Sequence, residues 1–226
     1  MSGRGRFITL EGGEGTGKST QARRLAQALR RRGLSVVETR EPGGSPGAEL
    51  LRAVLLEAPA ECWDAMSEAL ILSAARRDHL ATTIRPALAR GDWVVCDRFA
   101  DSTLAYQGFG HGVDPATLEQ LYDLAVGPFG PDLTLVLDLD PQVGLERAKA
   151  RGAETRFEHL DIGYHHRVHM GFIDIVAREP ERCAMISAAG DEETVEGRIL
   201  AAVEARMAEW SADADAVEGA DGPVAD

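Results

Sequence analysis

The most restrictive feature of this sequence is a glycine-rich stretch, EGGEGTGKST, at residues 11–20. Gly12, four intervening residues, Gly17, Lys18 and Ser19 match the pattern G-x4-G-K-[ST]. Glycines let consecutive backbone N–H groups point inward around an anion, and a helix that begins at the loop adds its positive N-terminus. The stretch therefore predicts a fold in which a strand, a phosphate-binding loop and a helix follow one another.

The residues on either side of the loop fit the order strand, loop and helix. Residues 6–10, RFITL, form a short, partly β-branched apolar run typical of a buried strand. After the loop, apolar residues recur at helical spacing up to Gly33, namely Ala22, Leu25, Ala26 and Leu29. The chain has only two lysines, Lys18 and Lys149. Because a phosphate loop needs a compact ammonium rather than a planar fork, Lys18 in this position favours phosphate binding.

Length and composition narrow the class of protein. A chain of 226 residues is long enough for one α/β domain with small insertions. It contains no apolar run of about 18 residues and no signal-peptide pattern, so we expect a cytoplasmic protein. Cys62, Cys96 and Cys183 are far apart and have no C-x-x-C spacing, which argues against a disulfide framework or a zinc site.

The chain is acidic, and part of its negative charge lies at the C-terminal end. The formal net charge of −13 disfavours a nucleic-acid polymer as partner, because phosphate backbones select basic surfaces. Residues 211–226 carry acids, no bases and few large apolar groups. Such a composition predicts a disordered tail, outside a domain at residues 1–210.

Further apolar runs alternate with helical patterns along the chain. The runs lie at residues 35–40, 92–97, 133–139 and 183–188, which with residues 6–10 makes about five strands. This alternation predicts a doubly wound, mostly parallel sheet with helices on both faces. Ligands of such sheets bind beyond the carboxyl ends of the strands, where this sequence places the phosphate loop, Arg40, Asp97 and Arg98. A long helix expected at residues 63–85 carries Leu72 and Arg76 on one face.

Residues outside the phosphate loop indicate which class of nucleotide-binding protein this is. The chain contains no asparagine, so the guanine-recognition motif N-K-x-D of switch GTPases is absent. Arginines are instead frequent at strand ends and in one loop, at Arg40, Arg76, Arg98, Arg151 and Arg156. Guanidinium forks bind phosphate in a bidentate manner, and a phosphoryl transfer between two nucleotides has several phosphates to hold.

Four segments together resemble one family. EGGEGTGKST, TREPGGS, CDRFADST-x-x-YQG and ARGAETRFE, in this order, are similar to thymidylate kinases of the bacterial type, over essentially residues 5–205. The resemblance implies a P-loop kinase with a short lid at about residues 150–160 that transfers the γ-phosphoryl group of ATP to dTMP, giving dTDP, with Mg²⁺. It also implies a homodimer.

The resemblance further implies roles for residues on the ATP side. Lys18 would bridge the β- and γ-phosphates, and Ser19 and Asp97 would hold the metal and its waters. The other ATP-binding residues would come from the loop: Gly12, Gly13, Glu14, Gly15, Thr16, Gly17 and Thr20. Because the loop lacks an arginine, Arg151 and Arg156 of the lid would reach the transferring phosphoryl group.

For dTMP the resemblance implies a second set of residues. Glu14 would face the sugar, Arg40 and Arg98 would hold the acceptor phosphate, and Thr103 would read the base edge. A tyrosine under the ribose leaves little room for a 2′-hydroxyl and so favours deoxynucleotides. The complete expected set is Glu14, Arg40, Leu72, Arg76, Arg98, Ser102, Thr103, Tyr106 and Gln107.

Four positions depart from the family pattern. Leu72 stands where many relatives place a phenylalanine under the thymine, and Thr155 replaces the acid of the lid motif D-R-F-E. His169 replaces an arginine, and Ser187 replaces the acid of a strand-end I-D-A. These changes concern the affinity for the base and the adenine side.

Two other hypotheses remain open on the sequence. The chain could be a monophosphate kinase with another base preference, against which Thr103, Tyr106 and REPGG argue. It could also be a nucleotide-binding regulatory module without turnover, which the intact Lys18, Ser19 and Asp97 disfavour. An assay with ATP and a panel of monophosphates separates these possibilities.

Overall fold

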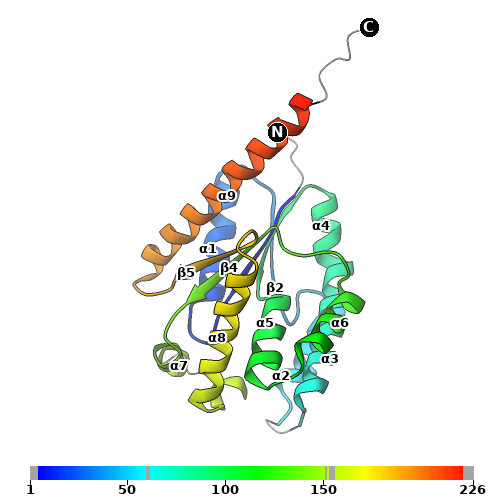
Figure 1. Cartoon of the computed structure of the whole chain (residues 1–226), viewed down its shortest axis with the longest axis vertical. Helices are drawn as coiled ribbons and strands as arrows, with labels where there is room; N and C mark the ends of the chain where they lie inside the picture. The colour runs from blue at the N-terminus through cyan, green and yellow to red at the C-terminus, as the bar shows by residue number, and fades with distance from the viewer. Residues whose placement is uncertain (1–4, 60–61, 151, 153–155, 221–226) are drawn as a thin grey trace.

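A parallel sheet lies at the centre of the computed structural model, which describes residues 5–59, 62–150, 152 and 156–220 (Figure 1). Within these residues five strands pair in the order β2-β3-β1-β4-β5, and every pair is parallel. The strands are β1 (Phe7–Glu11), β2 (Val36–Arg40), β3 (Trp93–Asp97), β4 (Leu133–Asp138) and β5 (Cys183–Ser187). The predicted doubly wound α/β sheet is confirmed.

Helices connect the strands and cover both faces of the sheet (Figure 1). They are α1 (Lys18–Arg31), α2 (Pro46–Leu56), α3 (Ala65–His79), α4 (Arg85–Ala89), α5 (Ala100–Thr103), α6 (Pro115–Ala125), α7 (Pro141–Ala150), α8 (Ile162–Arg178) and α9 (Glu192–Ala220). Two π-helical turns, η1 (Leu80–Ile84) and η2 (Leu104–Gly110), and a 3-10 turn, η3 (Arg156–His159), complete the described chain.

The helix predicted at residues 63–85 differs from the observed one. The observed helix α3 begins after the N-cap Asp64, whose side chain accepts a hydrogen bond from Ser67 N. The α-helical spacing is interrupted by η1 and resumes in α4. The apolar residues of the sequence do not reveal this widening, because buried Leu80 and Ile84 fit either spacing.

Alternate residues of each strand pack into the two layers of the core. Ile8 and Leu10 of β1 belong to a cluster with buried residues of α1 and α9, such as Leu25 and Val203. The side chain of Phe7 lies on the opposite face of the sheet. It packs with buried residues from η1, α4 and the end of α6. Burial on both faces explains why these strands are continuous apolar runs rather than alternating ones.

The register of the strands gathers the expected functional residues at one edge. Leu10 pairs with Asp97, and Arg40 of β2 also pairs with Asp97, so the ends of β1, β2 and β3 are level. The chain leaving β3 stays close to β1, because Arg98 N donates a hydrogen bond to Leu10 O. The phosphate loop and the segments after β2 and β3 therefore meet at the carboxyl edge of the sheet.

The C-terminal part of the chain is helical beyond the predicted domain boundary at residue 210. Helix α9 continues to Ala220, and residues 221–226 of the predicted tail lie outside the described residues. The assignment of residues 211–226 as a disordered tail stays a prediction. Among the helices of the described residues, none has the length and hydropathy needed to span a bilayer. Cys62, Cys96 and Cys183 are all free thiols.

Candidate functional site

The glycine-rich stretch forms a tight loop between β1 and α1. Gly12, Gly15 and Gly17 have positive φ angles of 133°, 66° and 89°. A Cβ on Gly15 would lie 1.9 Å from Gly144 O at the start of α7, so only glycine fits this left-handed position. Lys18 begins α1, and its Nζ folds back to donate to Gly13 O at 2.6 Å. The lysine thus lies over the loop that it must complete.

Lys18 is held in an unusual electrostatic environment. Burial lowers the pKa of its ammonium to about 8, and the nearby positive charge of Arg98 acts in the same direction. Glu14 and Asp97 oppose this effect but do not outweigh it. A bound anion would restore the usual preference for the charged form. The loop is therefore electrostatically suited to a ligand with several negative charges.

Arg98 connects the end of β3 with the loop. It is the one non-glycine residue of the described chain with a positive φ, at 70°, a strained conformation of the kind found at functional sites. Its Nη2 donates to Glu14 Oε1 at 3.0 Å and to the Tyr106 hydroxyl at 2.8 Å. Its Nη1 donates to Gly12 O at 3.1 Å and to Ser102 Oγ at 3.0 Å. One guanidinium thus fixes four groups around the opening of the loop.

Glu14 is the acidic partner in this cluster. It also accepts a hydrogen bond from the Tyr106 hydroxyl at 2.7 Å. Burial acts to raise the pKa of Glu14, but the charges of Arg98 and Lys18 and the tyrosine hydrogen bond hold it below its ordinary value. The loop therefore presents a carboxylate that stays ionised and can accept a hydrogen bond from a ligand hydroxyl.

Ser19 and Asp97 meet on the other side of Lys18. The Ser19 hydroxyl donates a short hydrogen bond to Asp97 Oδ2. Oδ1 of Asp97 is buried and has no hydrogen-bond partner within the described residues. Buried carboxylate oxygens normally have hydrogen-bond partners, so this oxygen is available to bind a ligand.

A second cluster lies between α3, α5 and η2. Arg76, 3% exposed, donates from Nη2 to Thr103 Oγ1 at 3.0 Å and from Nε to Glu41 Oε2 at 2.8 Å. Gln107 donates from Nε2 to Glu68 Oε2 at 3.0 Å. These long polar side chains are buried yet hydrogen-bonded, which gives them defined positions rather than a range of rotamers.

A single cavity of about 510 Å³ joins the two clusters. It is lined by most residues that the sequence predicted, namely Glu14, Gly15, Thr16, Gly17, Lys18, Ser19, Thr20, Arg40, Leu72, Arg76, Asp97, Arg98, Ser102, Thr103, Tyr106 and Gln107. Gly12 and Gly13 do not line it. Arg40 reaches the rim, where its Nη2 pairs with Glu49 at 3.0 Å.

Several lining residues had no role in the sequence analysis. Glu41 stands inside the quoted TREPGGS motif, and Arg52, Arg147 and Asp191 come from α2, α7 and the start of α9. Arg147 donates from Nη1 to Ala188 O at 3.3 Å. In the sequence, the arginines of α2 and α7 look like ordinary solvated helix residues, and only the folded arrangement places them here.

The side chains of the two lid arginines lie outside the part of the chain that the structure describes. Arg151 and Thr155 lie outside the described residues, and Arg156 belongs to η3, where only its backbone is described. Phe157 and Glu158, the next residues, do line the cavity. The ring of Phe157 packs edge-to-face against Tyr106 with centroids 5.9 Å apart. The C-terminal end of the expected lid therefore borders the cavity.

The structure shows the contacts of the other three residues that depart from the family pattern. Leu72 lines the cavity, so an aliphatic side chain takes this part of the wall. His169 Nε2 lies 2.7 Å from Asp138 Oδ1, away from the main cavity. Ser187 ends β5, and its carbonyl accepts from Arg198 Nη1 at 2.8 Å.

Known proteins are similar to this chain in sequence and architecture. Residues 10–199 match the model of the thymidylate kinase family. A thymidylate kinase of Caulobacter vibrioides is 49% identical over 203 residues, covering 90% of this chain and 98% of that protein. One of Rhizorhabdus wittichii is 51% identical over 201 residues, covering 88% and 97%. The crystal structure of thymidylate kinase from Ehrlichia chaffeensis is 34% identical and has a TM-score of 0.75, covering 89% of this chain and 100% of that one. This chain belongs to the thymidylate kinase family.

Proposed function

We propose that this protein transfers the γ-phosphoryl group of ATP to dTMP, giving dTDP and ADP, in the synthesis of dTTP. The observation that carries the proposal is the continuous cavity, with the phosphate loop and Lys18 at one end and Arg76, Thr103 and Tyr106 at the other. One cavity can hold both nucleotides, so the donor phosphate and the acceptor phosphate meet beside Arg98. Proximity and charge stabilisation supply most of the catalysis in such transfers.

On the donor side, the loop and Lys18 hold the phosphates of ATP. Gly12, Gly15 and Gly17 allow the backbone turn, and Lys18 neutralises charge that grows on the β,γ-bridging oxygen. Thr16, Gly17, Ser19 and Thr20 at the start of α1 complete the anion site, because the first N–H groups of a helix are free to donate. Gln21 and Val195 extend the cavity beyond this point.

On the acceptor side, Arg98 and Arg40 hold the phosphate of dTMP. Glu14 accepts a hydrogen bond from the sugar, while Leu72 and Tyr106 enclose the sugar and base. Arg76, Ser102, Thr103 and Gln107 supply the polar contacts of this half of the cavity. The tyrosine is fixed by its hydroxyl bonds and by aromatic neighbours such as Phe172, so it resists displacement by a larger sugar.

The residues beside Lys18 suit a Mg²⁺ ion. Asp97, with its unpartnered buried Oδ1, and the Ser19 hydroxyl offer hard oxygen ligands, which this ion prefers. No cluster of three or more His, Cys, Asp or Glu side chains fit for a metal occurs among the described residues. An ion held by two protein ligands, phosphate oxygens and waters fits this environment. When bound, it would neutralise charge on the phosphates of ATP.

The lid is proposed to supply the cation that the phosphate loop lacks. Arg156 and Arg151 are the candidates, and the packing of Phe157, the residue after Arg156, against Tyr106 supports this proposal. An arginine that engages the transferring phosphoryl group lowers the barrier without strengthening ground-state binding.

We also propose a cytoplasmic homodimer. Large apolar side chains are exposed on neighbouring helices: Leu50 and Val54 on α2, Leu70 on α3 and Leu124 on α6. Exposed apolar groups gathered on adjacent helices are typical of subunit interfaces. Sedimentation equilibrium should give twice the chain mass of 24.3 kDa, and a monomer at micromolar concentration would contradict this assembly.

The acceptor preference tests the proposed function. With ATP as donor, kcat/KM should fall in the order dTMP, dUMP and then UMP, with AMP and GMP poorer still. The 5-methyl group can contribute only about 1–3 kcal/mol in an apolar pocket, whereas a 2′-hydroxyl meets the fixed Tyr106 ring. Initial rates measured with each monophosphate decide the matter. If AMP or UMP were the best acceptor, the assignment to dTMP would be wrong.

Proton uptake on ATP binding should reveal the state of Lys18. With a pKa of about 8, the buried amine is largely neutral above that pH, and phosphate charge should raise its pKa. Binding should therefore take up protons, and more of them at pH 9 than at pH 8. Calorimetry in buffers of different ionisation enthalpy measures this number. Exposed Lys149→Ala should show the same uptake, and zero uptake at both pH values would refute the lowered pKa.

A further inference from the structure

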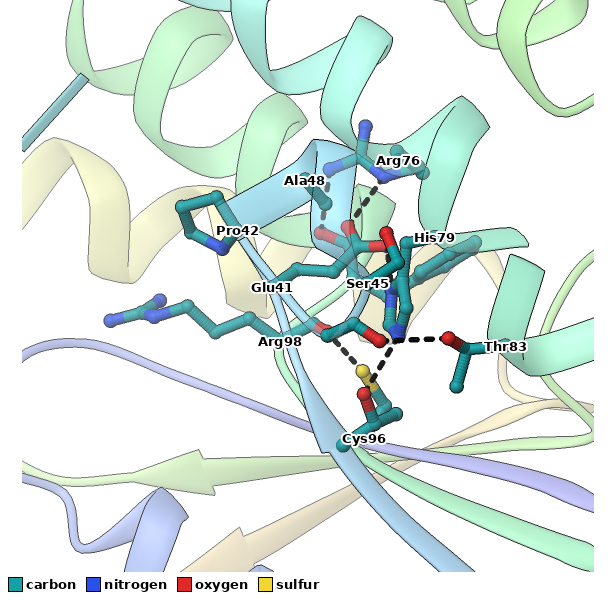
Figure 2. Close-up of polar contacts among 12 residues, drawn as sticks. Glu41, Pro42, Ser45, Ala48, Arg76, His79, Thr83, Cys96 and Arg98 are labelled. Atoms are coloured by element: carbon teal, nitrogen blue, oxygen red, sulfur yellow. Dashed lines mark hydrogen bonds and ion pairs between the residues drawn. The ribbon is translucent and has the colours of Figure 1, made fainter. Parts of the chain in front are cut away.

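Arg76 is anchored by a buried chain of side chains that extends away from the cavity. His79 lies one helical turn after Arg76 on α3 and is 0% exposed. Its Nδ1 lies 3.1 Å from Glu41 Oε1, while Glu41 Oε2 accepts from Arg76 Nε at 2.8 Å. Figure 2 shows the Glu41 carboxylate between the Arg76 and His79 side chains. One carboxylate therefore joins a residue that lines the cavity to one that does not.

The other end of the chain is fixed to the sheet. His79 Nε2 lies 2.7 Å from Thr39 Oγ1 on β2. Because a carboxylate can only accept hydrogen bonds, Nδ1 donates to Glu41, and Nε2 of a neutral ring then accepts from the Thr39 hydroxyl. Both ring nitrogens are thus used. The imidazole bridges β2 and the residue that begins the next loop.

The loop after Glu41 is fitted to the histidine. A Cβ on Gly44 would lie 2.4 Å from His79 Nε2 and 2.4 Å from Thr39 Oγ1, so the glycine backbone packs against this hydrogen bond. Thr83 then donates from Oγ1 to Gly44 O at 2.8 Å, which holds the loop in place. These contacts fix the position of His79 relative to the loop that carries Glu41.

The bonds of Arg76 leave one nitrogen for a ligand. Nε donates to Glu41, and Nη2 donates to Thr103 Oγ1 and to Phe99 O. Nη1 has no hydrogen-bond partner within the described chain. It is also not one of the buried polar atoms that lack a partner. Arg76 lines the cavity, and Nη1 is the nitrogen of its guanidinium that is left to bind an acceptor there. A donor nitrogen there suits a carbonyl oxygen and disfavours an amino group.

We propose that His79 is a positioning residue that fixes Glu41 and, through it, the direction of Arg76 Nη1, and so sets the preference for a keto over an amino pyrimidine as acceptor. The proposal rests on the proposed function. Without the imidazole, the Glu41 carboxylate loses one of its two anchors, and the guanidinium that it holds can rotate. An arginine that rotates freely would still bind phosphate. It would distinguish a carbonyl oxygen from an amino group on the pyrimidine poorly.

The test compares kcat/KM for dTMP and dCMP in variants of His79. His79→Phe fills the space but forms no hydrogen bond, and should lower the dTMP to dCMP ratio at least about tenfold, mainly through KM for dTMP. KM for ATP should change less than about twofold. His79→Asn, whose amide N–H replaces Nδ1–H, should restore the ratio to within about threefold of the original.

Two further variants separate positioning from stability. Thr83→Val removes a hydrogen bond to the same loop without touching the path to Arg76, so it should lower the melting temperature and leave the ratio unchanged. If His79→Phe does not fold, Thr39→Val, which frees the far nitrogen of the imidazole, should lower the ratio in the same direction. A folded His79→Phe, or in its absence Thr39→Val, with an unchanged ratio would overturn the inference. Wild-type protein that failed to phosphorylate dTMP would instead overturn the proposed function.

Discussion

Replacing Lys18 by alanine should lower kcat for phosphoryl transfer by at least about 10³-fold, because the ammonium neutralises charge that develops as the β,γ-bond breaks. Lys18 is the cation folded over the loop, with Nζ 2.6 Å from Gly13 O. The variant should remain folded, since Lys18 lines the cavity and belongs to none of the hydrophobic clusters of the described residues. Initial rates with saturating ATP and dTMP give the loss directly.

The second lysine of the chain provides the matched control. Lys149 lies near the end of α7 and is exposed, so Lys149→Ala should keep full activity. Circular dichroism and thermal unfolding of both variants show whether the fold is intact. A folded Lys18→Ala protein with near wild-type turnover would remove this loop from the mechanism.

Replacing Arg98 by alanine should lower kcat/KM for dTMP by about 10²- to 10³-fold. Its guanidinium joins Glu14, Tyr106 and Ser102, and the loss would leave the Glu14 carboxylate without its ion-pair partner. Arg98→Lys should recover only part of the rate, because an ammonium cannot reproduce the planar fork that bridges these groups. Steady-state kinetics with dTMP as the varied substrate measure both variants.

A surface arginine serves as the comparison for this change. Arg90, which pairs with Asp92 and is largely exposed, can be replaced by alanine with no expected change in kinetics. Activity of Arg98→Lys equal to that of the wild type would mean that charge alone matters, and that the bidentate role assigned to Arg98 is wrong.

The parts of the fold that could be predicted are those encoded by local signals. The phosphate loop follows from glycines whose positive φ angles few other residues adopt, and Asp114 and Asp140 mark helix starts before proline. The five strands follow from apolar runs, and those of β1, β3 and β4 are buried on both faces. The π-helical turn η1 has no comparable local signal, which explains why the predicted long helix differs from α3.

The site was predictable where residues sit in the motif or at a strand end. Asp97 and Arg98 follow β3 directly, and the parallel register brings them beside the loop. Glu41 and His79 are 38 positions apart, and nothing in the sequence pairs them. Arg52 and Arg147 likewise acquire their places only from the packing of α2 and α7. Tertiary pairing, unlike turn and cap chemistry, leaves no periodic trace in the sequence.

The most direct test of the central claim follows the phosphorus atom itself. The protein is incubated with Mg²⁺, dTMP and ATP labelled in its γ-phosphoryl group, and the nucleotides are separated. Direct transfer predicts that the label appears in the β-phosphate of dTDP, with one ADP formed for each dTDP and no label in inorganic phosphate beyond the background. Label that appeared only in inorganic phosphate, or that remained in ATP, would contradict the account.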